Sequence, residues 1–237
     1  MVQIVAGYIP RDLIERAVDQ GIQIRPYRRG INYLAFDDTA EGVSPAGDSF
    51  CAAIAHKDGD ELILDWCVEH KPPFNTAAVT HQITEILKAY RISQILGDAH
   101  SVGFSSNEYA RHGIKRLESC DLSKSELYLE VLPAFSAGRI RLLANDRLVS
   151  QFCSLERRTI VGAADKVDHP RGAHDDLANA VAATLWRAAS KTGKLNITQE
   201  TLHTMKAPGR YRSSRAGFSG ALDAYQMAQF TRVSNKS

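Results

Sequence analysis

INYLAFDD, residues 31–38, is a short apolar run that ends in two carboxylates, and the fold can be worked out from this stretch. Apolar runs of this length between turn formers are typical of buried strands. Two more strands are expected downstream, FCAAIAH (50–56) and ELILDWCVEH (61–70). The turn formers TAEGVSPAGDS (39–49) precede the first of them, and a hairpin turn over residues 57–60 precedes the second. Three successive strands with short connections predict an antiparallel meander.

The hydrophobic period changes after Pro72 and Pro73, where apolar residues begin to recur at helical spacing. The expected elements from there on are a helix over 76–90, a strand over 92–98, a helix over 105–113, a strand over 114–120, a helix over 123–138, an extended segment over 139–143, and helices over 146–157 and 174–189. This order predicts an α/β fold with a mixed sheet, antiparallel in its first three strands and parallel in the later ones. Helices should cover both faces of that sheet.

Composition is that of an ordinary soluble globular protein, because 44% of the 237 residues are hydrophobic and 24% are charged. No apolar run approaches the roughly 18 to 20 residues of a membrane span, and the N-terminus lacks the apolar core of a signal peptide, so no membrane partner is expected. The cysteines are widely spaced and predict buried free thiols in a reducing, cytoplasmic setting. They are Cys51, Cys67, Cys120 and Cys153.

Charge is distributed unevenly along the chain. Residues 191–237 contain eight Lys or Arg and two Asp or Glu, a net charge of +6, whereas the whole chain carries +2. Residues 1–190 therefore carry about −4. An acidic body suits a site that needs cations, and the basic segment is attracted to polyanions. We expect three parts: a leader or linker over 1–30 that contains a short helix at 11–19, a folded domain over 31–190, and a basic tail over 191–237.

Carboxylates fall where two strands end and where the last long helix begins. Asp37 closes the strand 31–38, Asp98 closes the strand 92–98, and Asp175 and Asp176 open the helix 174–189. Ligand sites of open α/β sheets lie at strand ends, and a buried carboxylate is costly unless a cation meets it. Oxygen ligands without a His/Cys quartet favour Mg²⁺ or Mn²⁺. Two such ions suit phosphodiester hydrolysis.

Each of these carboxylates also has an ordinary structural interpretation. A single Asp at a strand end is commonly a turn residue, and Asp175 and Asp176 are suited to capping a helix. Asp38 and Asp48 are interpreted as turn residues and left outside the site. His174 is expected to pack beside the site rather than to bind metal. The metal site is predicted from the joint placement of the carboxylates, not from any one of them.

Several motifs of the sequence resemble those of the nuclease domain of the large terminase subunit of tailed bacteriophages. GAHDDLANAVA (172–182) closely resembles the last motif of that domain, YLAFDD followed by GDSF its first strand and turn, and ILGD (95–98) its second acidic motif. The stretch 123–143, followed by a helix containing RLVSQFCSLERR, resembles the segment between the second and third motifs. The resemblance covers about residues 30 to 190, in the same order and spacing.

The resemblance implies a ribonuclease H-like fold over residues 31–190 and a metal-dependent endonuclease that cuts double-stranded, concatemeric phage DNA in the cytoplasm of the infected host. Its metal ligands would be Asp37, Asp98 and one or both of Asp175 and Asp176. A related resolvase-type pattern has acidic residues three apart on the last helix, and Asp176 and Asn179 occupy those positions here. Asp176 is therefore slightly preferred as the direct ligand.

Large terminases also contain an ATPase motor, and this chain has no GxxxxGK[ST] phosphate loop. The chain is therefore expected to be the nuclease part without the motor, with portal protein and small terminase subunit as further partners, contacted through the tail. Phosphate contacts to DNA are expected from Lys124, Arg139, Arg158, Lys166 and Arg171. Two alternatives stay open: a resolvase- or integrase-like nuclease of the same fold, and a non-catalytic module that docks on the portal.

Overall fold

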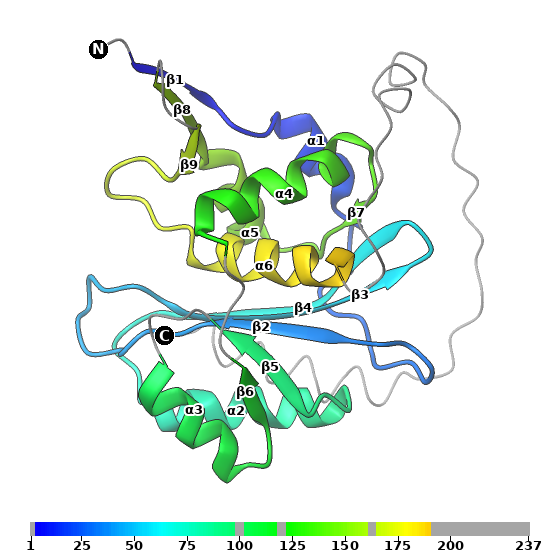
Figure 1. Cartoon of the computed structure of the whole chain (residues 1–237), viewed down its shortest axis with the longest axis vertical. Coiled ribbons are helices and arrows are strands. Elements are labelled where there is room, and N and C mark those ends of the chain that lie inside the picture. Colours follow the sequence, from blue (N-terminus) through cyan, green and yellow to red (C-terminus); the bar gives the residue numbers. More distant parts are fainter. Residues whose placement is uncertain (1–2, 98–101, 118–121, 161–164, 191–237) are drawn as a thin grey trace.

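A six-stranded mixed sheet lies at the centre of the protein, with the strand order β6-β5-β2-β3-β4-β7 (Figure 1). The computed structural model describes residues 3–97, 102–117, 122–160 and 165–190. The antiparallel meander is formed by β2 (Leu34–Asp38), β3 (Phe50–Asp58) and β4 (Glu61–His70). The strands that join in parallel are β5 (Gln94–Gly97), β6 (Lys115–Leu117) and β7 (Ile140–Arg141). The predicted mixed sheet is confirmed.

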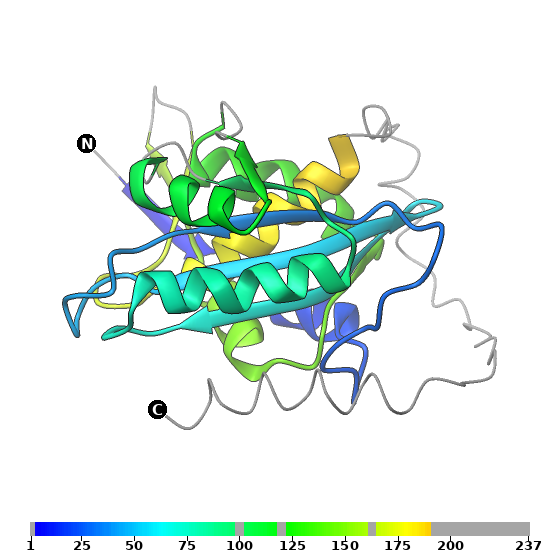
Figure 2. The same cartoon turned by 90° about the horizontal axis from the view of Figure 1, so that it is seen from below.

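Helices cover both faces of this sheet, as predicted (Figures 1 and 2). One face carries α2 (Thr76–Ala89) and α3 (Val102–Arg111). The other face carries α1 (Arg11–Ala17), α4 (Lys124–Ser136), α5 (Asp146–Ser154) and α6 (Asp176–Ser190). The apolar side chains form two clusters, one under each helical layer.

Local sequence explains where these helices begin and what they bury. The side chain of Asn75 accepts a hydrogen bond from the backbone N–H of Ala78 at the start of α2. The predicted Ser123–Glu126 capping box starts α4. The alanines of α6 are small enough for the helix to lie close against β3, and nearly all of its residues are buried. The sheet face under α6 is thus covered by the last described helix of the chain.

Alternation along β2 decides which side chains reach that helix. Leu34 and Phe36 pack in the cluster under α6, whereas Ala35 packs in the cluster under α2. Successive side chains of a strand point to opposite faces. Asp37 therefore faces the layer of α2 and α3, and Asp38 faces α6.

A second, three-stranded sheet was not predicted from the sequence. It is antiparallel and consists of β1 (Gln3–Gly7), β8 (Glu156–Ile160) and β9 (Lys166–Asp168), in that order. The helix expected over 146–157 ends at Ser154 because the chain turns extended to form β8.

The segment before residue 30 packs with the rest of the described chain instead of standing apart as a linker. Ile14 is fully buried in the core cluster under α6, and the backbone N–H of Asp19 donates to the carbonyl of Leu142 at 3.0 Å. A domain boundary at residue 30 stays a prediction. The expected tail, 191–237, lies outside the described residues.

Three of the four cysteines lie within the described residues, and all three are free thiols, as predicted. Cys51 and Cys67 are buried and Cys153 is partly buried, whereas Cys120 lies outside the described residues. None of the helices in the described ranges is long and apolar enough to cross a membrane.

Candidate metal centre

Asp176, the first residue of α6, faces a loop that connects β2 to β3. The backbone N–H of Ser49 donates to its Oδ2 at 2.9 Å. The Nδ1 atom of His174 lies 3.9 Å from the same oxygen and 3.8 Å from Oδ1 of Asp48. Asp48, His174 and Asp176 form a group whose ligand atoms all lie within 4.8 Å of one another. Such a group is compact enough to share one divalent cation.

Asp175 points elsewhere, although it is the adjacent residue. The hydroxyl of Tyr128 donates to its Oδ2 at 2.9 Å, and Nζ of Lys124 donates to its Oδ1 at 2.9 Å. Its side chain is only 1% exposed. Since both carboxylate oxygens are already engaged in the interior, the geometry favours Asp176 over Asp175 as a metal ligand.

Asp38 is held on the same face of the sheet as Asp176. The amide Nδ2 of Asn179 donates to Oδ2 of Asp38 at 2.7 Å. Asn179 follows Asp176 by three residues, so both side chains lie on one side of α6. The loop that carries Asp48 connects the strand of Asp38 to the next one. Asp38, Asp48 and Asp176 thus belong to one end of the sheet.

Asp37 does not join this group, contrary to the sequence interpretation. Its carboxylate is bound by Nε of Arg116 at 3.0 and 3.3 Å, and both side chains are completely buried. Burial raises the pKa of Asp37 to about 6, and the charge of Arg116 and the hydroxyl of Tyr109 act in the opposite direction. Asp37 and Asp176 lie on opposite faces of β2 because neighbouring residues of a strand alternate.

The sequence interpretation chose Asp37 as a metal ligand and left Asp38 and Asp48 outside the site as turn residues, and in the structure it is Asp38 that lies on the face of α6. The period-two alternation of 31–38 already separated the two faces, but the sequence did not show which face receives the last helix. Asp98 follows Gly97, the last residue of β5, and lies outside the described residues.

Negative charge accumulates in the group of Asp48, His174 and Asp176, and a bound cation would offset it. Burial raises the pKa of Asp176; the Ser49 N–H lowers it, Asp48 and Asp175 raise it further, and His174 lowers it. Like charges close together disfavour ionisation, whereas a divalent cation stabilises the ionised form of every ligand at once. The carboxylates are hard ligands that fit Mg²⁺ or Mn²⁺, and the imidazole of His174 also suits softer divalent ions.

Four of the five predicted DNA-contact residues lie on the segments next to Asp175. Burial opposes the charge of Lys124, but Asp175 and Asp168 outweigh it and raise the pKa of the lysine. Lys166 is 63% exposed beside Asp168, and Arg158 donates to the carbonyl of His169. Arg171 is exposed in the turn before α6. Lys124, Arg158 and Lys166 thus lie around Asp168, His169 and Asp175.

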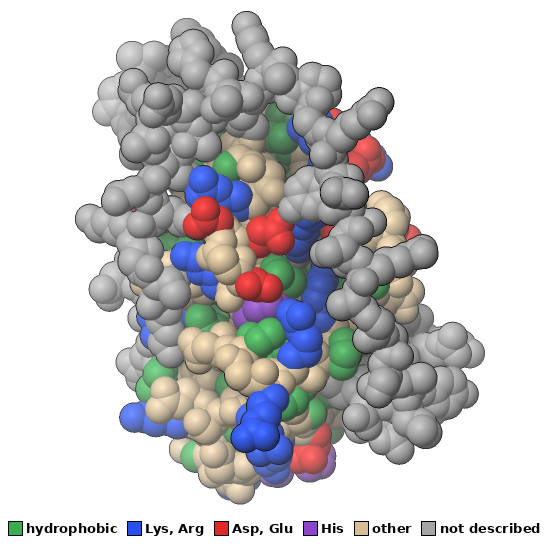
Figure 3. Space-filling view, turned by 90° about the vertical axis from the view of Figure 1, so that its right-hand side faces the viewer, with side chains coloured by type: hydrophobic (Ala, Val, Ile, Leu, Met, Phe, Trp, Pro, Cys, Tyr) green, Lys and Arg blue, Asp and Glu red, His purple; other side chains and the backbone are tan. Residues whose placement is uncertain are grey.

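Arg139 lies at the opposite end of the sheet, since its carbonyl accepts the backbone N–H of Leu62 at the start of β4. That end also carries the ion pairs Arg141–Glu61 and Arg25–Asp19. Acidic and basic side chains are intermixed on this side of the molecule (Figure 3). The structure does not bring Arg139 together with the other predicted DNA contacts.

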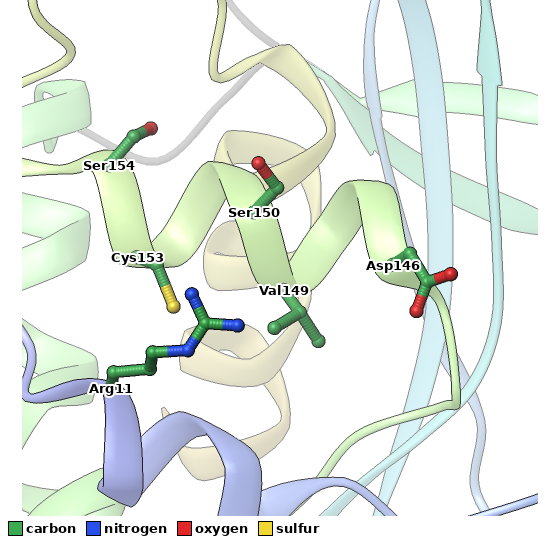
Figure 4. A pocket seen from close by; sticks show the side chains of 6 residues that line it. All are labelled: Arg11, Asp146, Val149, Ser150, Cys153 and Ser154. Carbon is green, nitrogen blue, oxygen red and sulfur yellow. The ribbon is translucent and has the colours of Figure 1, made fainter.

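A hollow of about 410 Å³ between α1 and α5 lies apart from the acidic group (Figure 4). Its lining includes Arg11, Ser150 and Cys153. Burial raises the pKa of the Cys153 thiol, so the thiol stays protonated at neutral pH and is a poor nucleophile. The acidic group remains the candidate for chemistry.

Solved nuclease domains of phage large terminases have a similar structure. The HK97 bacteriophage large terminase matches with a TM-score of 0.61 and 13% identity over 78% of this chain and 44% of that chain. The large terminase nuclease of thermophilic phage G20c with bound magnesium matches with a TM-score of 0.57 and 13% identity over 73% and 94%. The nuclease domain of the large terminase subunit of bacterial virus Sf6 matches with a TM-score of 0.56 and 12% identity over 76% and 98%.

The fold is therefore that of a terminase nuclease domain, as the resemblance of the motifs implied. This chain spans less than half the length of the HK97 large terminase. The G20c nuclease also has structures with bound cobalt and with bound zinc. At the level of sequence, the chain matches no protein-family model and no curated protein.

Proposed function

We propose that this protein is a divalent-metal-dependent endonuclease that cuts double-stranded, concatemeric phage DNA during genome packaging. The observation that carries the proposal is the gathering of Asp38, Asp48, His174 and Asp176 at one end of the sheet. The terminase nuclease fold supports the same function. Carboxylates bind the divalent cation, and the bound cation in turn attracts the anionic phosphodiester into the catalytic site.

The proposed ligand set is Asp38, Asp48 and Asp176, with Asp98 added from the sequence because it directly follows β5. Two Mg²⁺ or Mn²⁺ ions bound there would activate a water and stabilise the leaving oxygen of the phosphodiester. Bound magnesium in the similar G20c nuclease supports a divalent metal. Asp37, which the sequence suggested as a ligand, has a different role in this proposal, because Arg116 already neutralises it.

The chain's own residues hold these ligands in place. Ser49 donates its N–H to one oxygen of Asp176, and Asn179 donates to one oxygen of Asp38. Hydrogen bonds of this kind orient metal ligands and tune their basicity. Lys124, Lys166 and Arg171 lie on the segments next to Asp175 and are the proposed contacts to the DNA backbone.

The proposed function covers the cutting of DNA but not its translocation. Since the sequence has no phosphate loop, we propose that it supplies cutting and that translocation depends on an ATPase outside these residues. Contacts to portal protein and small terminase subunit are proposed for the basic segment 191–237. If so, deleting that segment leaves the cleavage of naked DNA largely intact.

Cleavage of supercoiled plasmid with Mn²⁺ tests the proposed function. Asp38→Asn and Asp176→Asn should each reduce the rate by several orders of magnitude, because a lost metal ligand costs several kcal/mol of transition-state stabilisation. Asp60→Asn, in the exposed β3–β4 turn, is the matched control and should cut like the wild type. Metal-independent cutting, or full activity of Asp176→Asn, would rule the proposal out. A strong preference for branched DNA would point instead to a resolvase of the same fold.

A further inference from the structure

We propose that Glu69 is a positioning residue of the metal centre, which fixes the loop before β3 against the start of α6 and does not bind the metal itself. Glu69 is the next-to-last residue of β4. The inference rests on the metal centre proposed above, and within it on Asp48 and Asp176, the carboxylates that this loop and this helix carry.

Glu69 lies in a row of side chains that crosses the sheet under α6. Asp38 of β2 pairs in register with Cys51 of β3, and Cys51 pairs with Glu69 of β4. Residues directly opposite each other on neighbouring strands share a face, and Cys51 packs in the core cluster under α6. Burial raises the pKa of the Cys51 thiol, and the charges of Glu69, Asp38 and Asp176 raise it further. Glu69 is thus on the same face of the sheet as the carboxylates of the metal centre.

Donors from the loop before β3 and from α5 converge on the carboxylate of Glu69. The hydroxyl of Ser49 donates to its Oε1 at 3.3 Å, and Nε2 of Gln151 donates to the same oxygen at 3.2 Å. Nε of Arg147 donates to its Oε2 at 3.0 Å. Only 8% of the Glu69 side chain is exposed. Because donors engage both oxygens and Arg147 balances the charge, Glu69 suits a supporting role better than that of a metal ligand.

Ser49 connects this carboxylate to both the loop and the helix. Its hydroxyl is bound by Glu69, while its backbone N–H donates to Oδ2 of Asp176 at 2.9 Å. Ser49 also directly follows Asp48 in the chain, and it is only 5% exposed. Holding the hydroxyl of Ser49 therefore restricts both the direction of its N–H and the place of Asp48.

Gln151 forms a second connection, which reaches the first turn of α6. Its Nε2 donates to Glu69, and its Oε1 accepts the backbone N–H of Ala178 at 2.8 Å. The first N–H groups of a helix have no acceptor within the helix, and Gln151 satisfies one of them. The side chain of Gln151 is buried, so this contact is shielded from water. Glu69 is thereby linked to the start of α6 through the backbone of the helix as well.

Two hydrogen-bonded paths therefore run from Glu69 to Asp176, one through the loop and one through the helix. The side chain of Asp48 is 79% exposed, so its position depends on the loop rather than on packing. Partners that stand behind metal ligands orient them, and losing such a partner typically costs about 10- to 100-fold in metal affinity. We expect Glu69 to contribute on this scale.

Two variants test this role, Glu69→Gln and Ser49→Ala. Each is measured for Mn²⁺ affinity by calorimetry without DNA, for thermal unfolding, and for plasmid cleavage over a range of Mn²⁺ concentrations. Glu69→Gln loses the charge that orients Arg147 and Gln151, so it should bind Mn²⁺ about 10- to 100-fold more weakly and still approach the wild-type rate at saturating Mn²⁺. Ser49→Ala keeps the N–H that binds Asp176 and loses only the link to Glu69, so its affinity should fall in the same direction but less.

Thr184→Val is the matched control, because it removes a buried hydrogen bond on the same helix, from Oγ1 of Thr184 to the carbonyl of Ala180 at 2.7 Å, and should keep the wild-type Mn²⁺ affinity. A wild-type Mn²⁺ affinity in folded Glu69→Gln, or in Ser49→Ala if Glu69→Gln does not fold, would overturn the positioning role. A saturated rate as low as that of Asp176→Asn would overturn it too, since Glu69 would then act as a ligand. The metal centre itself would fail differently, through absence of Mn²⁺ binding by the wild type or unchanged cleavage by Asp176→Asn.

Discussion

Replacing Tyr128 by Phe tests whether Asp175 is a structural carboxylate beside the metal centre. The Tyr128 hydroxyl is fully buried and donates to Oδ2 of Asp175 at 2.9 Å. A hydrogen bond to a charged group contributes roughly 1.5–3 kcal/mol, so we expect the variant to lose about 2 kcal/mol of unfolding free energy. For a domain of this size that corresponds to a fall in Tm of about 4–8 °C.

Cleavage should respond much less than stability. Lys124 still holds the other oxygen of Asp175 at 2.9 Å, and neither Tyr128 nor Asp175 belongs to the proposed ligand set. The assay pairs thermal unfolding with plasmid cleavage at saturating Mn²⁺. Tyr8→Phe is the matched control, since its hydroxyl donates to the uncharged carbonyl of Tyr128 at 2.8 Å and should cost only about 1 kcal/mol. An unchanged Tm in Tyr128→Phe, or a cleavage defect as deep as that of Asp176→Asn, would refute this account of Asp175.

Three further predictions concern the two faces of β2. Gly97→Ala should destabilise the protein by about 3–5 kcal/mol, because the added methyl group displaces the buried Asp37–Arg116 pair. Gly7→Ala is the control: its methyl group meets no atom within 4 Å, so this variant should unfold near the wild-type urea midpoint. Asn179→Leu removes the donor to Asp38 and should raise the Mn²⁺ concentration for half-maximal cleavage by about tenfold with little change in maximal rate; an unchanged requirement would exclude this support. The pKa of Asp37 is raised to about 6, so the folded protein holds this proton more tightly than the unfolded chain does, and the contribution of Asp37 to the free energy of unfolding falls as the pH rises from about 4 through 6. In urea titrations at several pH values, Asp37→Asn should lack this fall in unfolding free energy. An identical pH dependence in both proteins would show that another group causes it.

Periodicity predicted the main sheet because its strands are long, apolar and close together in the chain. It did not predict the small sheet, whose strands give little apolar signal: β8 begins Glu156-Arg157-Arg158, and β9 has only three residues. The pairing of β1 with β8 also joins segments about 150 residues apart, beyond the reach of any local pattern. Tertiary pairing, not local preference, makes these segments extended.

The metal ligands predicted from the sequence stay a prediction, but the structure shows how these residues lie in the fold. The sequence indicated carboxylates at the end of β2 and at the start of α6, and it slightly favoured Asp176 over Asp175 as the metal ligand. The sequence alone does not separate Asp37 from Asp38, because apolar side chains precede them on both faces of the strand and helices cover both faces of the sheet. The choice depends on which face receives α6, and on Arg116, a surface-type residue that the fold buries against Asp37.

The placement of α6 has a consequence for the time at which the protein first becomes active. This helix supplies Asp176 and fills the core above β3, yet it is the last described element to leave the ribosome. Until about residue 190 has been synthesised, β3 lacks the helix that packs on it and the carboxylate group lacks Asp176. Contacts between segments so distant in the chain also form slowly. Under the proposed function, the nascent chain would bind metal and cut DNA only after synthesis has passed this helix.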